Sequence, residues 1–202
     1  IFCSIILVSS SKAQDFDWPS YGGDNGSSKY AQLNQINAEN VSQLVTAWEW
    51  ESPDNALVSD IIRDGGPMLR PGPFKATPVV VDGSMYLPTT YGQIVSLNPV
   101  SGQINWIFDT KTYEDGRPTN LGFNVRGVAY WDGGEEKRIF FATNNSYLWS
   151  IDSATGIPDS GFGNDGKIDL TLGLGRPVDR GQYGVVSPPL VSNNKVVVNS
   201  IV

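Results

Sequence analysis

The chain of 202 residues contains no histidine and only one cysteine, Cys3. Without histidine, these residues form no Ser-His-Asp triad, no histidine-ligated zinc site and no imidazole acid–base pair. A lone cysteine makes no disulfide within the chain and says little about the redox compartment. Basic residues are also few, since 14 Lys and Arg stand against 21 Asp and Glu, and they form no run. A nucleic-acid surface needs a basic stripe, so we expect no nucleic-acid partner.

Glycine and proline are abundant, with 22 and 13 residues, while only 17% of the residues are charged. This composition is typical of short strands joined by turns, and it predicts an all-β fold. A weak helical pattern is limited to residues 34–44. The segment 52–73 contains Gly65-Gly66-Pro67 and Arg70-Pro71-Gly72-Pro73, so we expect it to be a loop.

Residues 1–13 predict a truncated secretory signal peptide. An apolar run over residues 1–10 is followed by small residues and Lys12-Ala13-Gln14, which indicates cleavage after Ala13. The alternative is a buried N-terminal strand, and the run is shorter than the roughly 20 residues of a membrane span. We therefore expect a periplasmic protein, with residues 14–202 as the N-terminal portion of one domain. Residues 195–202 predict an apolar strand without a closing turn, so we expect the protein to continue beyond them.

Two stretches of the chain, 54 positions apart, share one pattern. The first contains Ser96-Leu97-Asn98 and closes with Ser101-Gly102, and the second contains Ser150-Ile151-Asp152 and closes with Thr155-Gly156. Both predict a strand followed by a short turn. Self-similarity at this length indicates a β-propeller or a similar array, in which one unit cannot bury its own apolar face.

Three strand pairs repeat around this pattern, each joined by a turn such as Asp82-Gly83. Two pairs are followed by a third strand. The first pair also has a fourth strand, which carries Trp106, whereas Gly161-Phe162-Gly163 replaces that strand in the second copy. Four short antiparallel strands form a propeller blade. The expected pairs are 76–81 with 85–87, 127–131 with 138–142 and 187–191 with 195–198, the third strands are 93–97 and 147–151, and the fourth is 104–108.

These units predict part of a propeller, namely blades 1 and 2 and the start of blade 3. The segment 46–51 alternates apolar and polar residues as a half-buried strand does. We expect it to act as an N-terminal strand that closes the propeller, because an unpaired strand would expose its backbone. The connections 109–126 and 158–186 are long, and loops of this length on a compact scaffold are commonly functional.

Four segments resemble the quinoprotein dehydrogenases that use pyrroloquinoline quinone (PQQ), in particular the branch of bacterial glucose and quinate dehydrogenases. The resemblance extends from about residue 15 to residue 202, and the four segments are specific only when taken together. They are WPSYGGDNGSSKY (18–30), FKATP (74–78), NVRGVAYW (124–131) and FGNDGKIDL (162–170), the last of which leads to Ser187-Pro188-Pro189.

The resemblance implies an eight-bladed propeller with PQQ in its central funnel beside a calcium ion, of which this chain is about the first third. It implies a periplasmic enzyme that oxidises a hydroxyl group of an alcohol, polyol or sugar. Electrons would pass to a quinone or a cytochrome, with peripheral association to the membrane. By the family layout, the catalytic aspartate and the calcium ligands lie beyond Val202. We therefore expect no catalytic and no metal-binding residue in this chain, and an inactive fragment.

Four residues are candidates for cofactor binding. Arg126 follows a long loop and begins an inner strand, and the resemblance matches it to the cofactor-contacting arginine of the family; the rigid fork of arginine suits the carboxylates of PQQ. Lys75 stands where relatives place Glu or Gln, and it either pairs with a PQQ carboxylate or is solvated at the rim. Ser187 is a weak substitute for a cofactor-bonding threonine, because Val186 occupies the best-matching position. Ser200 lies near the strand end that contacts the quinone in the family.

Two further groups of residues are expected to be structural or solvated. Adjacent cysteines mark the methanol-oxidising branch, and Asn120-Leu121 stands in their place, which points away from that branch. We expect solvated loop carboxylates at Asp60, Asp64, Glu114 and Asp115, and blade-packing side chains at Trp48, Trp50, Trp106, Trp131 and Trp149.

Two alternative functions remain open. One is a non-enzymatic PQQ-like propeller that binds proteins as a scaffold, such as an outer-membrane assembly lipoprotein. The motif at Arg126 with its long preceding loop disfavours it, and so does Cys3, which lies inside the apolar run rather than after it. The other is a lectin-like sugar-binding propeller, for which no specific feature speaks.

Overall fold

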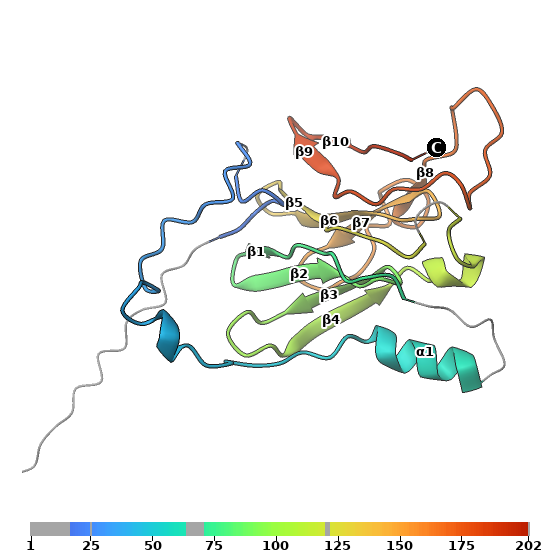
Figure 1. The fold of residues 1–202 in the computed structure, drawn as a ribbon. Helices are drawn as coiled ribbons and strands as arrows, with labels where there is room; N and C mark the ends of the chain where they lie inside the picture. The colour runs from blue at the N-terminus through green and yellow to red at the C-terminus, as the bar shows by residue number, and fades with distance from the viewer. Residues whose placement is uncertain (1–16, 25, 64–70, 120–121, 202) are drawn as a thin grey trace, which may run out of the picture.

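The computed structural model describes residues 17–24, 26–63, 71–119 and 122–201, so the segment predicted as a signal peptide lies outside the described residues. Two four-stranded antiparallel sheets and a two-stranded hairpin follow one another along the chain. Figure 1 shows the first sheet in green, the second in yellow and orange, and the hairpin in red. This is the predicted partial β-propeller, with two four-stranded blades and the opening hairpin of a third.

Blade 1 consists of β1 (Val79–Val81), β2 (Ser84–Pro88), β3 (Gln93–Leu97) and β4 (Ile104–Asp109), paired in that order. The turn between β1 and β2 is Asp82-Gly83, with φ angles of 49° and 70°. Two central residues with positive φ form the turn that matches the twist of an antiparallel pair, which is why Asp-Gly specifies this hairpin. The four strands predicted for this blade are confirmed.

Blade 2 repeats this order with β5 (Ala129–Asp132), β6 (Lys137–Ala142), β7 (Tyr147–Asp152) and β8 (Lys167–Asp169). The prediction that this copy lacks a fourth strand was wrong, because β8 pairs with β7 over three residues. The strand lies further along the chain than the spacing of the repeat suggests. Phe162, from the segment that was expected to replace the fourth strand, packs on Phe140, with ring centroids 5.6 Å apart.

Blade 3 begins with the hairpin of β9 (Leu190–Ser192) and β10 (Lys195–Val197), as predicted. Its turn residues Asn193 and Asn194 have φ angles of 48° and 56°, a conformation that asparagine tolerates better than most residues. Val191, Val196 and other apolar side chains of this segment pack against the buried residues of blade 2.

The largest apolar cluster lies between blades 1 and 2, and it joins the two sheets face to face. Its members alternate along the strands, since every second side chain of a strand points to the same face. Removing this apolar surface from water is the main force that holds the blades together. The buried members are Val79, Val81, Tyr86, Ile94, Val125, Val128, Ile139, Phe141, Trp149 and Ile151.

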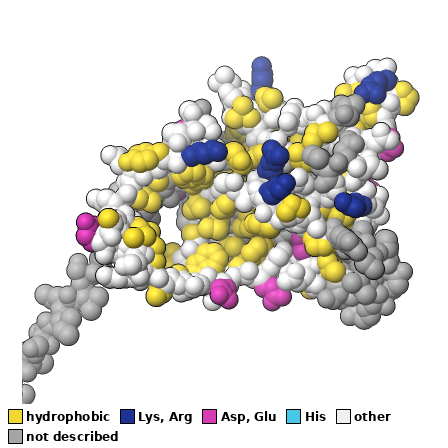
Figure 2. Space-filling model, in the orientation of Figure 1, with side chains coloured by type: hydrophobic (Ala, Val, Ile, Leu, Met, Phe, Trp, Pro, Cys, Tyr) yellow, Lys and Arg dark blue, Asp and Glu magenta, His cyan; other side chains and the backbone are white. Residues whose placement is uncertain are grey.

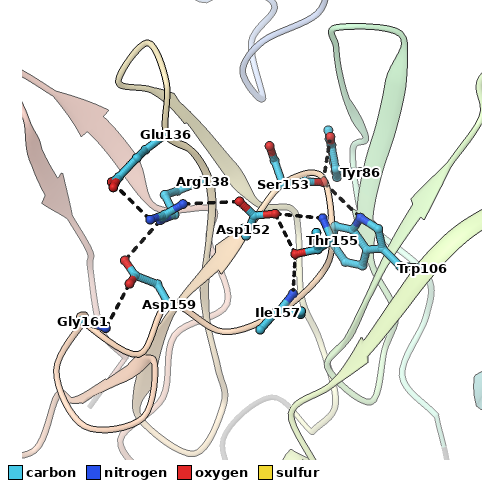
Figure 3. Close-up of polar contacts among 10 residues, drawn as sticks. All are labelled: Tyr86, Trp106, Glu136, Arg138, Asp152, Ser153, Thr155, Ile157, Asp159 and Gly161. Carbon is cyan, nitrogen blue, oxygen red and sulfur yellow. Dashed lines mark hydrogen bonds and ion pairs between the residues drawn. The ribbon is translucent and has the colours of Figure 1, made fainter.

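A tryptophan joins the outer part of blade 1 to the repeat turn of blade 2 (Figure 3). Trp106 of β4 donates its indole N–H to the carbonyl oxygen of Ser153 at 3.0 Å, and the hydroxyl of Tyr86 donates to the same oxygen at 3.2 Å. The ring lies on Gly156, where an added Cβ would come within 2.7 Å of ring atoms. The glycine of the repeated turn is therefore required, because the tryptophan packs directly on its backbone.

The same contact occurs one step earlier in the chain. Trp48 donates its indole N–H to the carbonyl oxygen of Pro99 at 3.1 Å, and its ring lies on Gly102 in the repeat turn of blade 1. Trp50 packs beside Leu87 and its neighbours on blade 1. The segment 46–51 forms no strand, contrary to the prediction, because no described strand lies beside it. It nevertheless occupies the place on blade 1 that β4 occupies on blade 2, and the expected packing role of the tryptophans is confirmed.

One arginine ties together the outer edge of blade 2 (Figure 3). Arg138 of β6 contacts Glu136 at 3.2 Å, Asp152 at 3.5 Å and Asp159 at 3.2 Å, and its side chain is only 14% exposed. Asp152 belongs to the repeat turn and Asp159 to the chain that leads to β8. Arg138 therefore fixes the course of the chain before the fourth strand.

The prediction of a helix within residues 34–44 was wrong, and a helix forms elsewhere in the chain. Within residues 34–44 only a single 3-10 turn forms, Val41–Gln43, whereas a helix, α1 (Asp54–Arg63), occupies part of the segment predicted as a loop. Leu57 and Val58 of α1 pack on the buried ring of Tyr91 in blade 1. Such contacts with distant residues stabilise the helix, and a local pattern does not reveal them. No helix of the described ranges has the length and apolar character that a membrane span requires.

Candidate functional site at the starts of the inner strands

The inner strands of the three blades, β1, β5 and β9, begin at the same end of the structure, which lies to the right in Figure 1. Backbone hydrogen bonds connect the segments before them. The N–H of Thr77 donates to the carbonyl oxygen of Arg126 at 2.9 Å, and the N–H of Arg126 donates to that of Val186 at 3.0 Å. The three segments that the sequence singled out before each blade are therefore direct neighbours.

Gly127 makes this close approach possible. A Cβ atom at this position would lie 3.1 Å from Cγ of Pro188 and 3.2 Å from the carbonyl oxygen of Thr77. Both distances are shorter than ordinary van der Waals contact, so a side chain here would push the neighbouring strands apart. The Arg-Gly pair thus combines a cation with a backbone position at which three blades meet.

Arg126 and Lys75 are exposed cations at this end of the structure. Neither side chain makes a hydrogen bond or an ion pair with another described residue. With no acidic partner in the part of the chain that the structure describes, a guanidinium and an ammonium group can bind an anionic ligand. Figure 2 shows apolar side chains gathered over the centre of the same view, with most of the visible Lys and Arg side chains above and to the right of them.

The buried aromatic rings of Phe123 and Tyr91 form a packed wall beside the segment that leads to Arg126. Phe123 is 1% exposed and stands edge-on to Tyr91, with ring centroids 4.8 Å apart. Burial, together with the charge of Asp54, raises the pKa of Tyr91 to about 12, so its phenol stays neutral at physiological pH. Gly72 lies against this wall, where an added Cβ would come within 1.7 Å of the carbonyl oxygen of Phe123. The segments that carry Lys75 and Arg126 are therefore in direct contact.

Asn124, two residues before Arg126, is a buried polar residue that the sequence reasoning missed. It is 5% exposed, and its side-chain oxygen is buried without a hydrogen-bond partner. A buried acceptor without a donor costs roughly 1–3 kcal/mol of stability. Its position within NVRGVAYW was the signal that the sequence offered.

The two predicted serines differ in placement. Ser187 is half-buried and directly follows Val186, whose side chain is buried and whose carbonyl oxygen accepts the bond from Arg126. Ser200 is exposed, and the backbone pairing of Ile201 with Gly184 brings its segment beside the start of β9. Ser187 therefore borders the linked strand starts directly, whereas Ser200 reaches them only through this bridge.

PQQ fits the chemistry of these side chains. It carries three carboxylates, for which Arg126 and Lys75 are two cations without an acidic partner among the described residues, while the hydroxyl of Ser187 is a neutral hydrogen-bonding group. For a metal ion the described residues offer less. No three of their Asp, Glu or Cys side chains come close enough to hold one.

The fold and these side chains define a class of protein, a β-propeller with exposed cations where its inner strands begin. Comparison with known proteins gives the family. The family described as PQQ: Glucose/ethanol/alcohol dehydrogenase, beta-propeller domain, matches residues 18–202, and the chain belongs to it.

Individual relatives agree with this assignment. Over 92% of its length the chain is 29% identical to the quinoprotein glucose dehydrogenase of Gluconobacter oxydans, and over 97% it is 25% identical to the quinate/shikimate dehydrogenase (quinone) of Acinetobacter baylyi. It spans 24% and 25% of the length of these relatives. In fold it resembles the quinohemoprotein alcohol dehydrogenase of Comamonas testosteroni, with a TM-score of 0.69 and 24% identity over 93% of this chain and 24% of that one.

Proposed function

We propose that the full-length protein is a PQQ-dependent dehydrogenase that oxidises a hydroxyl group of an alcohol, polyol or sugar. The main support for this proposal is the placement of Arg126. An exposed arginine without an acidic partner among the described residues starts the inner strand of blade 2, and its backbone is bonded to the segments that start the two neighbouring blades. A structural arginine would be expected to pair with a carboxylate, as Arg138 does with three.

The residues of this chain hold and orient the cofactor in this proposal. Arg126 and Lys75 bind its carboxylates, and Ser187 and Ser200 add hydrogen bonds. The wall of Phe123 and Tyr91 fixes the arginine segment from behind. When bound, PQQ supplies a quinone that accepts two electrons from the alcohol, in the presence of a cation such as Ca²⁺ that polarises its reactive carbonyl. In the proposal, the base that takes the hydroxyl proton and the ligands of Ca²⁺ belong to the part of the protein beyond residue 202.

The proposed substrate, electron acceptor and location rest on the names of relatives and on the sequence. Relatives are named glucose, glycerol, quinate/shikimate and alcohol dehydrogenases, which supports an alcohol, polyol or sugar as the substrate. Names that include a quinone or a haem group support transfer of electrons to a quinone or a cytochrome. The apolar run at residues 1–10 supports export to the periplasm.

Reconstitution of the full-length protein tests this proposal. The cofactor-free protein is mixed with PQQ and Ca²⁺, and reduction of an artificial dye is measured with glucose, quinate and simple alcohols. The proposal expects dye reduction with at least one of these substrates, and none when PQQ is omitted. If the intact protein does not bind PQQ, the enzyme proposal is wrong and the scaffold alternative replaces it.

A further inference from the structure

The turns between the second and third strands of blades 1 and 2 have the same hydrogen bonds. In blade 1 the N–H of Thr89 donates to the carbonyl oxygen of Gln93 at 2.7 Å, and its hydroxyl accepts the N–H of Gln93 at 3.1 Å. In blade 2 the N–H of Thr143 donates to the carbonyl oxygen of Tyr147 at 2.8 Å, and its hydroxyl accepts the N–H of Tyr147 at 3.1 Å. Residues 54 positions apart are therefore equivalent in the two turns.

In blade 1 this turn binds a carboxylate from within the chain. Asp54 of α1 accepts hydrogen bonds from the hydroxyl of Thr90 at 2.9 Å, the N–H of Tyr91 at 3.2 Å and the side-chain amide of Gln93 at 3.0 Å. The carboxylate is 5% exposed. A buried carboxylate is stable only when it is compensated in this way, so the turn of blade 1 is a carboxylate-binding site with its ligand built in.

In blade 2 the equivalent donors are open. Asn144 corresponds to Thr90 and is 5% exposed, yet its carboxamide makes no hydrogen bond with any described residue. The N–H of Asn145, which corresponds to that of Tyr91, has no partner among these residues either. Two donors without a protein partner at one turn are available to an acceptor that comes from outside the described residues.

The chain provides no counterpart of Asp54 here. Trp48 packs on Gly102 as Trp106 packs on Gly156. Asp54 lies six positions after Trp48, and the residue six positions after Trp106 is Thr112. The hydroxyl of Thr112 bonds to that of Thr110 at 2.8 Å. It also donates a hydrogen bond of 3.5 Å to the side-chain oxygen of Asn145, and it accepts none from the Asn144 side chain or the N–H of Asn145.

A cavity of about 420 Å³ lies over this turn. Asn144 and Asn145 line it, together with Arg117 and Arg180 from the two long connections. Asn144 also lines a much smaller adjoining cavity, which reaches Val186 at the linked strand starts. The larger space, here called the blade 2 cavity, therefore shares Asn144 with a smaller cavity that reaches the candidate cofactor site.

Some charged side chains around the blade 2 cavity have a partner among the described residues, and Arg117 has no ion-pair partner among them. Arg180 is paired with Asp169, while Asp115 and Asp179 line the cavity and accept hydrogen bonds from Asn145 and from the backbone of Gly181. Arg117 makes no ion pair with a described residue, and its guanidinium lies so close to Gly122 that an added Cβ would be 3.1 Å from its Nε. Among the described residues, the groups of the cavity without a protein partner include three kinds of donor: the guanidinium of Arg117, the side-chain nitrogen of Asn144 and the backbone N–H of Asn145.

We propose that the blade 2 cavity binds the carboxylate group of a small organic acid, in the position that Asp54 occupies on blade 1. The donors match a planar carboxylate, because a guanidinium and two amide N–H groups satisfy its oxygens from several sides. Two sources share this chemistry: a hydroxy acid from solution, or a carboxylate of PQQ that extends from the strand starts. The site itself exists whichever source supplies the carboxylate, and it does not depend on the proposed dehydrogenase activity.

Binding to the cofactor-free, full-length protein tests this proposal. Gluconate is titrated by calorimetry, with glucose as a probe of similar size that lacks the carboxylate. The proposal expects one gluconate per chain and no saturable glucose binding. Arg117→Gln and Asn144→Leu should each weaken gluconate binding by at least about tenfold, since each removes a hydrogen bond to a charged group. Arg176→Gln changes an exposed arginine outside the cavity and should leave the affinity unchanged.

The stability of the variants and a PQQ arm complete the test. Asn144→Leu replaces an unpaired buried amide by an apolar group of similar shape, so its unfolding temperature should equal or exceed that of the wild type. If Asn144→Leu fails to fold, the gluconate affinity of Arg117→Gln still tests the proposal, because Arg117 is an exposed residue. When PQQ is added first, continued gluconate binding assigns the site to an external acid. Displacement of gluconate, with weaker PQQ binding by Arg117→Gln, assigns it to the cofactor. Equal gluconate affinity in wild type and Arg117→Gln, or equal affinity for glucose, overturns the proposal.

Discussion

The N–H of Thr77 donates a hydrogen bond of 2.9 Å to the carbonyl oxygen of Arg126, and so joins the start of the inner strand of blade 1 to that of blade 2. A second bond, from Arg126 to Val186, extends the link to blade 3. Both bonds use backbone atoms, so they persist when the side chain of Arg126 is replaced. The backbone links between the strand starts are therefore independent of the charged side chain of Arg126.

Gly72 sets the contact between the two cation-bearing segments. In Gly72→Ala the added Cβ would meet the carbonyl oxygen of Phe123 at 1.7 Å, so the segments that carry Lys75 and Arg126 must separate. We expect a loss of about 1–3 kcal/mol in stability, typical of overpacking, together with weaker PQQ binding. Thermal unfolding and a PQQ titration of the full-length protein measure the two effects. At Gly26 a Cβ meets only the carboxylate of Asp24 at 3.4 Å, so Gly26→Ala is the matched control; an equal effect of both changes would refute the contact.

Trp106 tests the junction between the blades. Trp106→Phe keeps most of the ring on Gly156 but removes the 3.0 Å hydrogen bond to Ser153, which should cost about 1 kcal/mol. Trp106→Ala also removes the packing and should cost about 3 kcal/mol. Unfolding temperatures should therefore fall in the order wild type, Phe variant, Ala variant. Two variants of equal stability would mean that the ring does not bear on Gly156.

The pH dependence of stability tests a second link between the blades. Hydrogen bonds from Lys137 at 2.6 Å and from Tyr130 at 2.8 Å hold the pKa of Asp82 below the usual 3.8, despite partial burial. A carboxyl group with a lowered pKa adds stability above its unfolded-state pKa, and this contribution is lost as the pH falls through the folded-state value. The wild type should thus be more stable than Asp82→Asn at pH 7.

This difference should persist down to about pH 4 and shrink below it, as the carboxyl group becomes protonated. Unfolding temperatures of the two proteins between pH 2 and pH 8 measure it. A difference that stays constant over this whole range would show that the charge of Asp82 contributes nothing.

The sequence was sufficient where local rules decide the structure. The hairpin at Asp82-Gly83 follows from a turn that only certain residues adopt, and the third strands 93–97 and 147–151 follow from β-branched and alternating residues. The sequence was insufficient where distant contacts decide it. The helix α1 depends on Asp54 binding to blade 1, and β8 lies beyond a turn whose length the repeat does not specify.

The candidate site divides in the same way. Arg126 was found because its motif resembles a family, and the structure adds that its side chain has no acidic partner among the described residues. Asn124 and Asn144 were missed, because an asparagine without a hydrogen-bond partner looks like any other asparagine in a sequence. The 54-residue repeat already aligned Asn144 with Thr90, but the meaning of that pair required the contact of Thr90 with Asp54.

The affinity of the cofactor-free, full-length protein for PQQ, compared between wild type and Arg126→Ala, tests the central claim most directly. We predict that the variant keeps the unfolding temperature of the wild type, because its backbone links remain, and binds PQQ at least about tenfold more weakly. Arg176→Ala, an exposed arginine in the connection to blade 3, should bind PQQ as the wild type does. Equal PQQ affinity in Arg126→Ala and wild type would contradict the assignment of the linked strand starts as the cofactor site.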